Sequence, residues 1–586
     1  MPFYVGEIRP FRWSEVKHIT NPQDLRGLSQ GDIVETFGHV FQWDQDCVPV
    51  ELCERWSHVG DPVCDAALRE AFKHPSATVG KDLLTALQEY AASTDSDTPA
   101  TKAFLDEVHQ LPPAGLLATE EEVCVAQELF VGDSIQIMQA LLHYSLAGGL
   151  ARCVNAYMRN LQLTGCMLHS SRIVRTLEAV SYLLPHVPKG KNRAPASLQD
   201  VISQISKESS DRTFVRLLET MQFILDVMGC SAPASPILPA KESGALANGD
   251  AVSPSSRLAS LLPGGEGWKS AVRVRLLHGV ARWRVQTRWE REHPAEAQSS
   301  VPISQEEVAA TLASFSTIPV WCLHRLHLPP SPAQVSAYLA LWRHVGFYMG
   351  VSPSILLRHF STPNAADKFI ATAALNLFLE ELSSSSSNSD TSLDTTAGSL
   401  LRRPTIPILV AVSNRPPLNT SVEYNIALTT HLLGQPIATH LGLPPTSVWT
   451  RIKMHAFLLL QRVPHYFAHW YPRKGWLEKR REVLREGMMR SVRWNMGMRR
   501  TTFRPRTAVR DSPDPAAGVE VHGGELAPGV AEAEGVRGDP ARAKELTRMW
   551  KEVFFEMVGV CVAACAVGGV LGYMGIRYIL SHVRLL

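Results

Sequence analysis

One histidine lies between two arginines in residues 272–285, VRVRLLHGVARWRV. In an α-helix, at about 100° per residue, His278 sits in a stripe with apolar residues on one side and Arg275 and Arg282 on the other. The two arginines lie roughly 10 Å apart along the helix axis. The stretch therefore predicts a helix that presents an imidazole from an apolar face bordered by positive charge.

A haem would make use of each of these features. Its iron accepts an imidazole nitrogen, its macrocycle needs an apolar wall, and its two propionates form an anionic edge. Arginine pairs with carboxylates through two hydrogen bonds and keeps its charge. Small residues, Gly279 and Ala281, would let a flat ring approach the helix. The alternative is a structural histidine bonded to a carbonyl, with arginines that extend outward, because one histidine has many structural uses.

Several other chemistries lack their sequence signatures. The chain has no GxSxG, no P-loop, no GxGxxG and no HExxH. None of the 21 histidines is followed at the second position by Asp or Glu, as the usual start of a non-haem iron triad would require. No cysteine lies in the glycine-rich loop of a thiolate-ligated haem enzyme. The net charge of +2 implies no attraction to nucleic acid.

The run Arg275-Leu-Leu-His278-Gly-Val-Ala-Arg282 resembles the RxxHxxxR signature of the rubber oxygenase (latex clearing protein) family, which includes the ER-bound oxygenases of mycophenolic acid biosynthesis. Three later segments resemble the family in the same order: 301–316 (VPISQEEVAATLASFS), 336–353 (SAYLALWRHVGFYMGVSP) and 432–444 (LLGQPIATHLGLP). The likeness spans roughly residues 120–490. It implies a globin-related helical domain with haem b, in which His278 ligates the iron and Arg275 and Arg282 support the haem or its ligand helix.

The family also carries a distal RxxKT cluster, and its counterpart here is Arg172-Ile-Val-Arg175-Thr176. The resemblance implies catalytic roles for Arg172, Arg175 and Thr176. The family lysine is replaced by Arg175, which stays protonated and offers no lone pair to iron. Arg175 would instead donate a hydrogen bond toward dioxygen; a helix-surface arginine paired with Glu178 is the alternative.

By this resemblance the chain is expected to be a haem b-dependent oxygenase that uses O2 to cleave a carbon–carbon double bond in an apolar isoprenoid or prenylated substrate. Two alternatives stay open. One is a non-catalytic helical scaffold or haem sensor, and the other is a hydroxylase or peroxygenase of the same fold. Fold and family do not fix the substrate.

The elements around this helix are expected to be mostly α. Apolar residues recur at a spacing of three to four in 82–92, 134–150, 168–184, 211–228, 268–291, 305–312, 332–349 and 365–382. Two helix starts carry capping signals, Ser304 with Glu307 and Ser331 with Pro332. Residues 406–412 are the best candidate for a strand.

Composition divides the chain into four parts. We expect an N-terminal extension over 1–119 and a haem oxygenase-like catalytic domain over 120–490, interrupted by a disordered serine-rich insertion at 383–399. Residues 231–267 read as a long surface loop. A basic and flexible tether is expected over 491–548, followed by a C-terminal transmembrane anchor over 549–586.

The anchor is indicated by residues 557–576, MVGVCVAACAVGGVLGYMGI, which carry no charge and would extend about 30 Å as a helix. A buried core helix is the alternative. More basic residues precede this span than follow it, so the positive-inside bias leaves the catalytic domain in the cytosol. With no apolar leader at the start and ten cysteines without a CxxC pair, a tail-anchored protein is expected, and the family favours the endoplasmic reticulum.

A second membrane contact is suggested by residues 473–506, which hold twelve Lys and Arg and three acidic residues among large apolar side chains. A basic amphipathic helix of this kind could lie on an anionic membrane surface. The alternative is a final helix that packs on the domain and exposes its charges to water.

Overall fold

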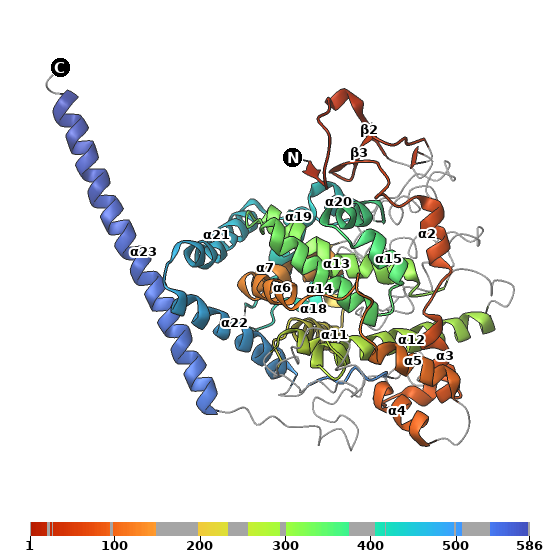
Figure 1. Cartoon of the computed structure of the whole chain (residues 1–586). Coiled ribbons are helices and arrows are strands. Elements are labelled where there is room, and N and C mark those ends of the chain that lie inside the picture. Colours follow the sequence, from red (N-terminus) through yellow and green to blue (C-terminus); the bar gives the residue numbers. More distant parts are fainter. Residues whose placement is uncertain are drawn as a thin grey trace.

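The computed structural model describes residues 2–19, 24–25, 27–93, 98–147, 197–231, 256–292, 301–373, 405–416, 418–496, 500–506 and 540–583. Helices dominate this part of the chain, and one long helix extends from the body (Figure 1). The predictions of a mostly α fold and of a long apolar helix near the C-terminus are confirmed. The predicted insertion at 383–399 and the predicted helix at 168–184 lie outside the described residues.

The N-terminal elements are strands β1 (Phe3–Tyr4), β2 (Val16–His18), β3 (Ile33–Thr36) and β4 (His39–Gln42), then helices α2 (Val50–Ser57), α3 (Pro62–Ala71), α4 (Leu83–Ser93) and α5 (Pro99–His109). The middle of the chain contains α6 (Glu120–Gly132), α7 (Ser134–Ala140), the π-helix η3 (Leu141–Leu146), α10 (Leu198–Gln204), α11 (Lys207–Val227), α12 (Glu266–Glu292), α13 (Gln305–Arg325), α14 (Pro332–Tyr348) and α15 (Pro353–His359). The last elements are α18 (Thr405–Val412), α19 (Val422–Leu433), α20 (Gln435–His440), α21 (Val448–Trp470), α22 (Lys474–Asn495) and α23 (Pro540–Val583).

Two helices begin at the capping residues expected from the sequence. The Glu307 carboxylate accepts a hydrogen bond from the Ser304 backbone N–H at 3.2 Å, at the start of α13. The Ser331 hydroxyl accepts one from the backbone N–H of Gln334 at 3.3 Å, with Pro332 at the first position of α14. Each cap satisfies a backbone donor that the helix itself leaves free, so these helix starts are set locally.

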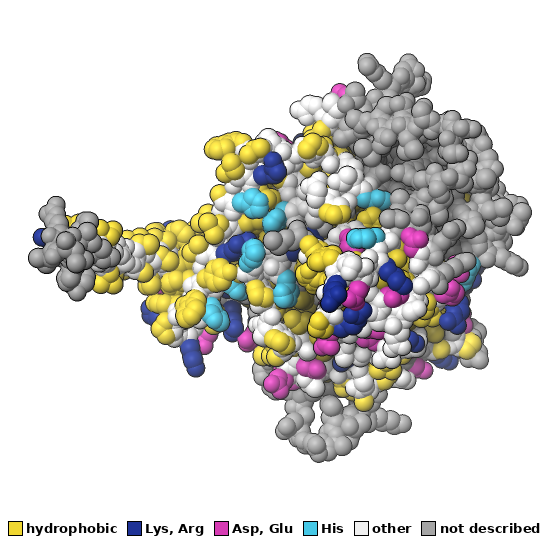
Figure 2. Space-filling view, turned by 90° about the horizontal axis from the view of Figure 1, so that it is seen from above, with side chains coloured by type: hydrophobic (Ala, Val, Ile, Leu, Met, Phe, Trp, Pro, Cys, Tyr) yellow, Lys and Arg dark blue, Asp and Glu magenta, His cyan; other side chains and the backbone are white. Residues whose placement is uncertain are grey.

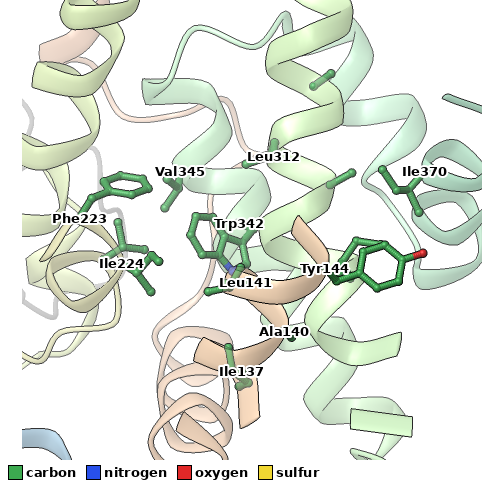
Figure 3. Packing of buried hydrophobic residues seen from close by; sticks show 14 of the residues in the cluster. Ile137, Ala140, Leu141, Tyr144, Phe223, Ile224, Leu312, Trp342, Val345 and Ile370 are labelled. Carbon is green, nitrogen blue, oxygen red and sulfur yellow. The ribbon is translucent and has the colours of Figure 1, made fainter. Parts of the chain in front are cut away.

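Part of the largest core cluster lies where α7, η3, α11, α13 and α14 meet (Figure 3). Trp342 of α14 is at its centre, with the ring of Phe315 at 5.3 Å and that of Phe223 at 6.2 Å between centroids. Leu141 and Tyr144 of the π-helix approach it from another side. Rings of this size bury much apolar surface at once, which holds the helices in fixed positions.

The N-terminal segment joins the same core. Its four short strands form one sheet in the order β1-β4-β3-β2, in which only the β3–β4 pair is antiparallel. Side chains such as Val34, Phe41 and Leu68 belong to the large core cluster, and Asp44 pairs with the buried Lys368. The described residues before position 119 and those after it therefore contribute to one core.

The strand prediction for residues 406–412 was wrong, because Thr405–Val412 forms helix α18. Nearly every side chain of this segment is buried, with α11 and α19 among its neighbours. An apolar run buried on all sides has no alternation of polar and apolar residues, so periodicity cannot distinguish a strand from a helix. The short strands of the N-terminal sheet were not predicted either.

Helix α23 is long and apolar enough to cross a membrane. Within the candidate range Ala541–Arg577, the most apolar window of 18 residues has a mean hydropathy of 2.1, and none of that window is buried against the protein. Its first turns pack along α22. In α22, Trp476, Met489 and Val492 are buried against the protein. The helical part of the basic segment, α22, thus packs on the body through these apolar side chains, which favours the second of its two interpretations.

Candidate functional site

Helix α12 carries His278 and is surrounded by α3, α4, α11 and α14. It is long, and its middle is enclosed while its last turns reach the edge of the body (Figure 1). The helix predicted for residues 268–291 is therefore confirmed as part of α12, Glu266–Glu292. What fixes its rotation about its own axis is a set of ion pairs.

Arg275 pairs with two carboxylates from the N-terminal segment. Its Nε and Nη2 donate to the two oxygens of Asp61 at 2.6 and 2.9 Å, and its Nη1 lies 2.7 Å from Glu107. Only 3% of Arg275 is exposed. Burial raises the pKa of Asp61, but the charge and hydrogen bonds of Arg275 lower it more, so the pKa lies below its usual range. Asp61 stays ionised in this setting.

Arg282 makes the matching contact about two turns further along the helix. Its Nε and Nη2 both donate to Asp65 at 2.8 Å, and its Nη1 donates to the carbonyl of Ile303 at 2.8 Å. The side chain is 2% exposed. Arg282 therefore ties α12 both to α3 and to the segment that leads into α13.

The two acidic partners follow from the local sequence of α3. Asp61 is the N-cap of this helix, accepts from the Cys64 N–H at 3.2 Å and precedes Pro62 at the first helical position. Asp65 follows four residues later on the same helix face. One short helix thus presents two carboxylates to the two arginines of α12, and buried bidentate pairs of this kind fix both position and rotation.

Gly279 lets α3 approach the ligand helix closely. A Cβ atom at this position would lie 2.7 Å from Leu68 Cδ1 and 2.8 Å from Cys64 Sγ. An added side chain would therefore have to displace the buried side chains of Leu68 and Cys64. Gly279, which was expected to let a cofactor approach α12, instead faces helix α3.

We expect Gly279→Ala to destabilise the protein, because overpacking costs about 1–3 kcal/mol and outweighs a helix-propensity gain of about 1 kcal/mol. Gly487→Ala is the matched control, since Gly487 also lies inside a helix but has no atom within 4 Å of its built Cβ. That control should gain stability. Denaturant unfolding of both variants measures the effect, and equal stabilisation of the two would contradict the close packing of α3 on α12.

His278 lies on the same helix with a ring nitrogen that has no partner. Among the described residues, no donor or acceptor forms a hydrogen bond with its buried Nδ1. Burial lowers the pKa of His278 to about 4, and the nearby Arg282 charge acts in the same direction. The imidazole is therefore neutral at neutral pH, which is the state that binds a metal ion.

Another buried histidine shows what a structural role looks like in this protein. His344 has both ring nitrogens in use, with Nδ1 3.3 Å from the backbone N of Ala118 and Nε2 3.2 Å from the carbonyl of Leu261. His278 lacks this arrangement. Other buried side-chain atoms without a partner occur in the described residues, such as His431 Nε2 and Trp342 Nε1, and at His278 a cofactor would supply the missing partner.

Buried neutral histidines give the cofactor-free protein a defined pH dependence. Burial lowers the pKa to about 3 for His143 and to about 4 for His278 and His344, from 6.5. Below pH 6.5 these histidines become protonated in the unfolded chain, whereas in the folded chain His278 and His344 stay neutral until about pH 4. Stability should therefore be complete above pH 6.5 and fall between pH 6.5 and 4. Thermal unfolding at about pH 7.5 and about pH 5 measures this, and an equal Tm at both would contradict it.

The structure brings together the three site residues predicted on α12, but not all with the expected partners. The spacing of Arg275 and Arg282 suggested propionate pairing, whereas each guanidinium binds a carboxylate of this chain. A direct contact of either arginine with a cofactor stays a prediction. The catalytic residues proposed from the distal cluster, Arg172, Arg175 and Thr176, lie outside the described residues.

Sequence reasoning missed Asp61, Asp65 and Glu107. The stretch Asp61-Pro-Val-Cys-Asp65 does carry a signal, a helix start with two acids one turn apart. Nothing in it points to α12, because 214 residues separate Asp61 from Arg275.

Part of the chain, including α12, resembles a known protein family. Residues 192–463 match the family described as ER-bound oxygenase mpaB/B′/rubber oxygenase, catalytic domain. The matched range includes α12 with His278 but does not reach back to α3. Among solved structures, latex clearing protein in its closed state is similar with 15% sequence identity and a TM-score of 0.37, over 74% of this chain and 91% of that one. No curated protein matches the chain.

The matched range agrees with the order of segments found in the sequence, with RxxHxxxR on α12 followed by α13, α14 and the region of α19 and α20. Residues 192–463 of this chain belong to the catalytic domain of the ER-bound oxygenase mpaB/B′ and rubber oxygenase family.

Proposed function

We propose that the chain is a membrane-anchored, haem b-dependent oxygenase that cleaves a carbon–carbon double bond in an isoprenoid or prenylated substrate. The observation that carries the proposal is His278, a neutral imidazole with an unpartnered buried nitrogen on the helix that bears the family signature. When bound, the haem iron would supply the activation of dioxygen, which no side chain performs.

The donor set fits a macrocyclic cofactor. Within the described ranges no group of three or more His, Cys, Asp or Glu side chains could hold a bare metal ion. A porphyrin would supply four nitrogen ligands of its own, so the protein would need to provide only one further nitrogen. His278 offers that nitrogen in the uncharged form.

The residues around His278 would orient and hold the imidazole. Asp61 and Asp65 neutralise Arg275 and Arg282 and lock the rotation of α12, so the histidine is presented in one direction. Arg282 lowers the pKa of His278, as burial does, which prevents a proton from competing for the ligating nitrogen. This arrangement is pre-organised before any cofactor binds.

Helix α23 would hold the enzyme at the membrane, where an apolar substrate is concentrated. Isoprenoid chains partition into bilayers, and the uncharged run 557–576 of α23 would hold the catalytic domain at that surface. We place the body on the cytosolic side and favour the endoplasmic reticulum, in line with the family description.

The reaction is tested with an isotopically labelled prenyl alkene under 18-O dioxygen. Cleavage of the double bond by one molecule of dioxygen gives two carbonyl compounds, because one oxygen atom goes to each of the two former alkene carbons. Each fragment should therefore carry one labelled oxygen. A single hydroxylated product of unchanged carbon skeleton would contradict cleavage and support a hydroxylase. The control is Glu552→Gln, which changes an exposed residue of α23 far from α12 and should leave the product pattern unchanged.

A further inference from the structure

Helix α21 turns an apolar stripe toward solvent instead of toward the core. Trp470 is 80% exposed, Leu460 65% and Trp449 64%. The remaining large apolar residues of this helix that are exposed are Val448, Ile452, Leu459, Val463 and Tyr466. A helix on the surface of a soluble protein normally shows the opposite pattern, with polar residues outward.

The exposed residues form one continuous band. At about 100° per residue they fall within an arc of roughly 120°, and the helix is about 34 Å long at 1.5 Å per residue. The opposite face is attached to the body through the buried Met454 and Leu458. Basic side chains border the band, among them Arg451, Lys453 and Arg462. This is the composition of a helix that lies in a membrane interface, with aromatic residues and cations at its margins.

The stripe ends where α23 leaves the body. Tyr471, the residue after α21, donates a hydrogen bond to Glu556 at 2.6 Å, and Arg473 pairs with the same carboxylate at 2.8 Å. The Trp476 indole donates to the Val553 carbonyl at 2.9 Å. Glu556 directly precedes the uncharged run that starts at Met557. Trp470 therefore lies close to the point along α23 at which the uncharged run begins.

The views of the whole molecule agree with this placement. Helices α21 and α22 are the parts of the body nearest to α23 (Figure 1), and hydrophobic, histidine and basic side chains are mixed on the face beside it (Figure 2). The end of the exposed stripe at Trp470 therefore lies next to the attachment of the helix that is apolar enough to span a membrane.

We propose that α21 is an in-plane membrane helix, and that a lipid bilayer with anionic headgroups covers its exposed stripe. The inference rests on α23 as the membrane anchor, but not on haem or on catalysis. Because α23 and α21 would then both contact the bilayer, the body could not rotate freely about its anchor. One face of the catalytic domain would stay against the source of apolar substrates.

The test uses the full chain in vesicles of phosphatidylcholine and phosphatidylserine that contain a lipid with a diazirine near the top of its acyl chain. After illumination, labelled peptides are mapped by mass spectrometry. We expect labelling of 557–576 and also of 448–470. The peptide that contains Leu357, which is 48% exposed on α15, is the control for exposed apolar surface elsewhere and should remain unlabelled.

Two variants sharpen the result. Trp449→Glu combined with Leu460→Glu should lower labelling of 448–470 several-fold without a change at 557–576, because both side chains are exposed and their replacement leaves the core intact. Leu357→Glu should change neither. Labelling of 557–576 alone would overturn the proposal. The proposal would also be overturned if a second copy of the chain covered 448–470 in detergent and protected this segment from labelling as much as the vesicles do. Neither result depends on cofactor content or product formation, so both are distinct from failure of the proposed oxygenase activity.

Discussion

Replacement of His278 by alanine is expected to abolish haem retention. The imidazole is the protein's only proposed bond to iron, and loss even of a group that merely orients a ligand lowers affinity by about 10–100-fold. Because the Nδ1 of the neutral His278 has no partner, the change breaks no existing hydrogen bond at that atom. Haem content per folded chain, measured by the pyridine haemochrome assay, should fall to background.

His469→Ala is the control, since His469 is exposed on α21 and should leave haem content unchanged. Added imidazole should restore part of the spectrum of His278→Ala, because the small molecule can occupy the space of the missing ring. Full haem content in His278→Ala would contradict the ligand assignment. Loss of haem without rescue, together with loss of cooperative unfolding, would indicate a folding role for this residue.

Replacement of Asp61 by alanine is expected to have the largest effect on stability. The change leaves Arg275 buried with only the partly exposed Glu107 as a partner, and removal of one partner from a buried pair costs about 3–5 kcal/mol. It also removes the N-cap of α3. Denaturant unfolding of the cofactor-free protein measures the loss.

Lys17→Ala is the matched control. Lys17 lies 2.6 Å from Asp32 but is 46% exposed, so its loss should cost about 0–1 kcal/mol. The double variant Asp61→Leu with Arg275→Leu should regain most of the stability, because no uncompensated charge of this pair stays buried. A loss for Asp61→Ala as small as that for Lys17→Ala would show that the pair does not hold α3 against α12.

Much of the helical framework could be predicted because its signals are local. The α12 helix, the capped starts of α13 and α14, and the long apolar α23 follow from periodicity, short-range hydrogen bonds and composition. The placement of His278 on α12 belongs to the same class, since one helix and its spacing suffice to define it.

Other features depend on contacts that local signals do not encode. Asp61 and Asp65, which pair with Arg275 and Arg282, lie more than 200 residues earlier in the chain. Residues 405–412 form a mostly buried helix, and their uniformly apolar sequence carries no periodicity that would have predicted it. The basic segment expected to lie on a membrane packs its apolar face on the body, while α21, which drew no attention in the sequence, exposes an apolar stripe. Which face of an amphipathic helix meets the protein is decided by tertiary packing.

The absorption spectrum of the purified full chain, in its oxidised and reduced states and after addition of hemin, tests the central claim most directly. A neutral imidazole at position 278 that ligates iron predicts a Soret band that shifts on reduction, with haem bound in proportion to protein. A folded preparation that is colourless and takes up no added hemin would contradict it.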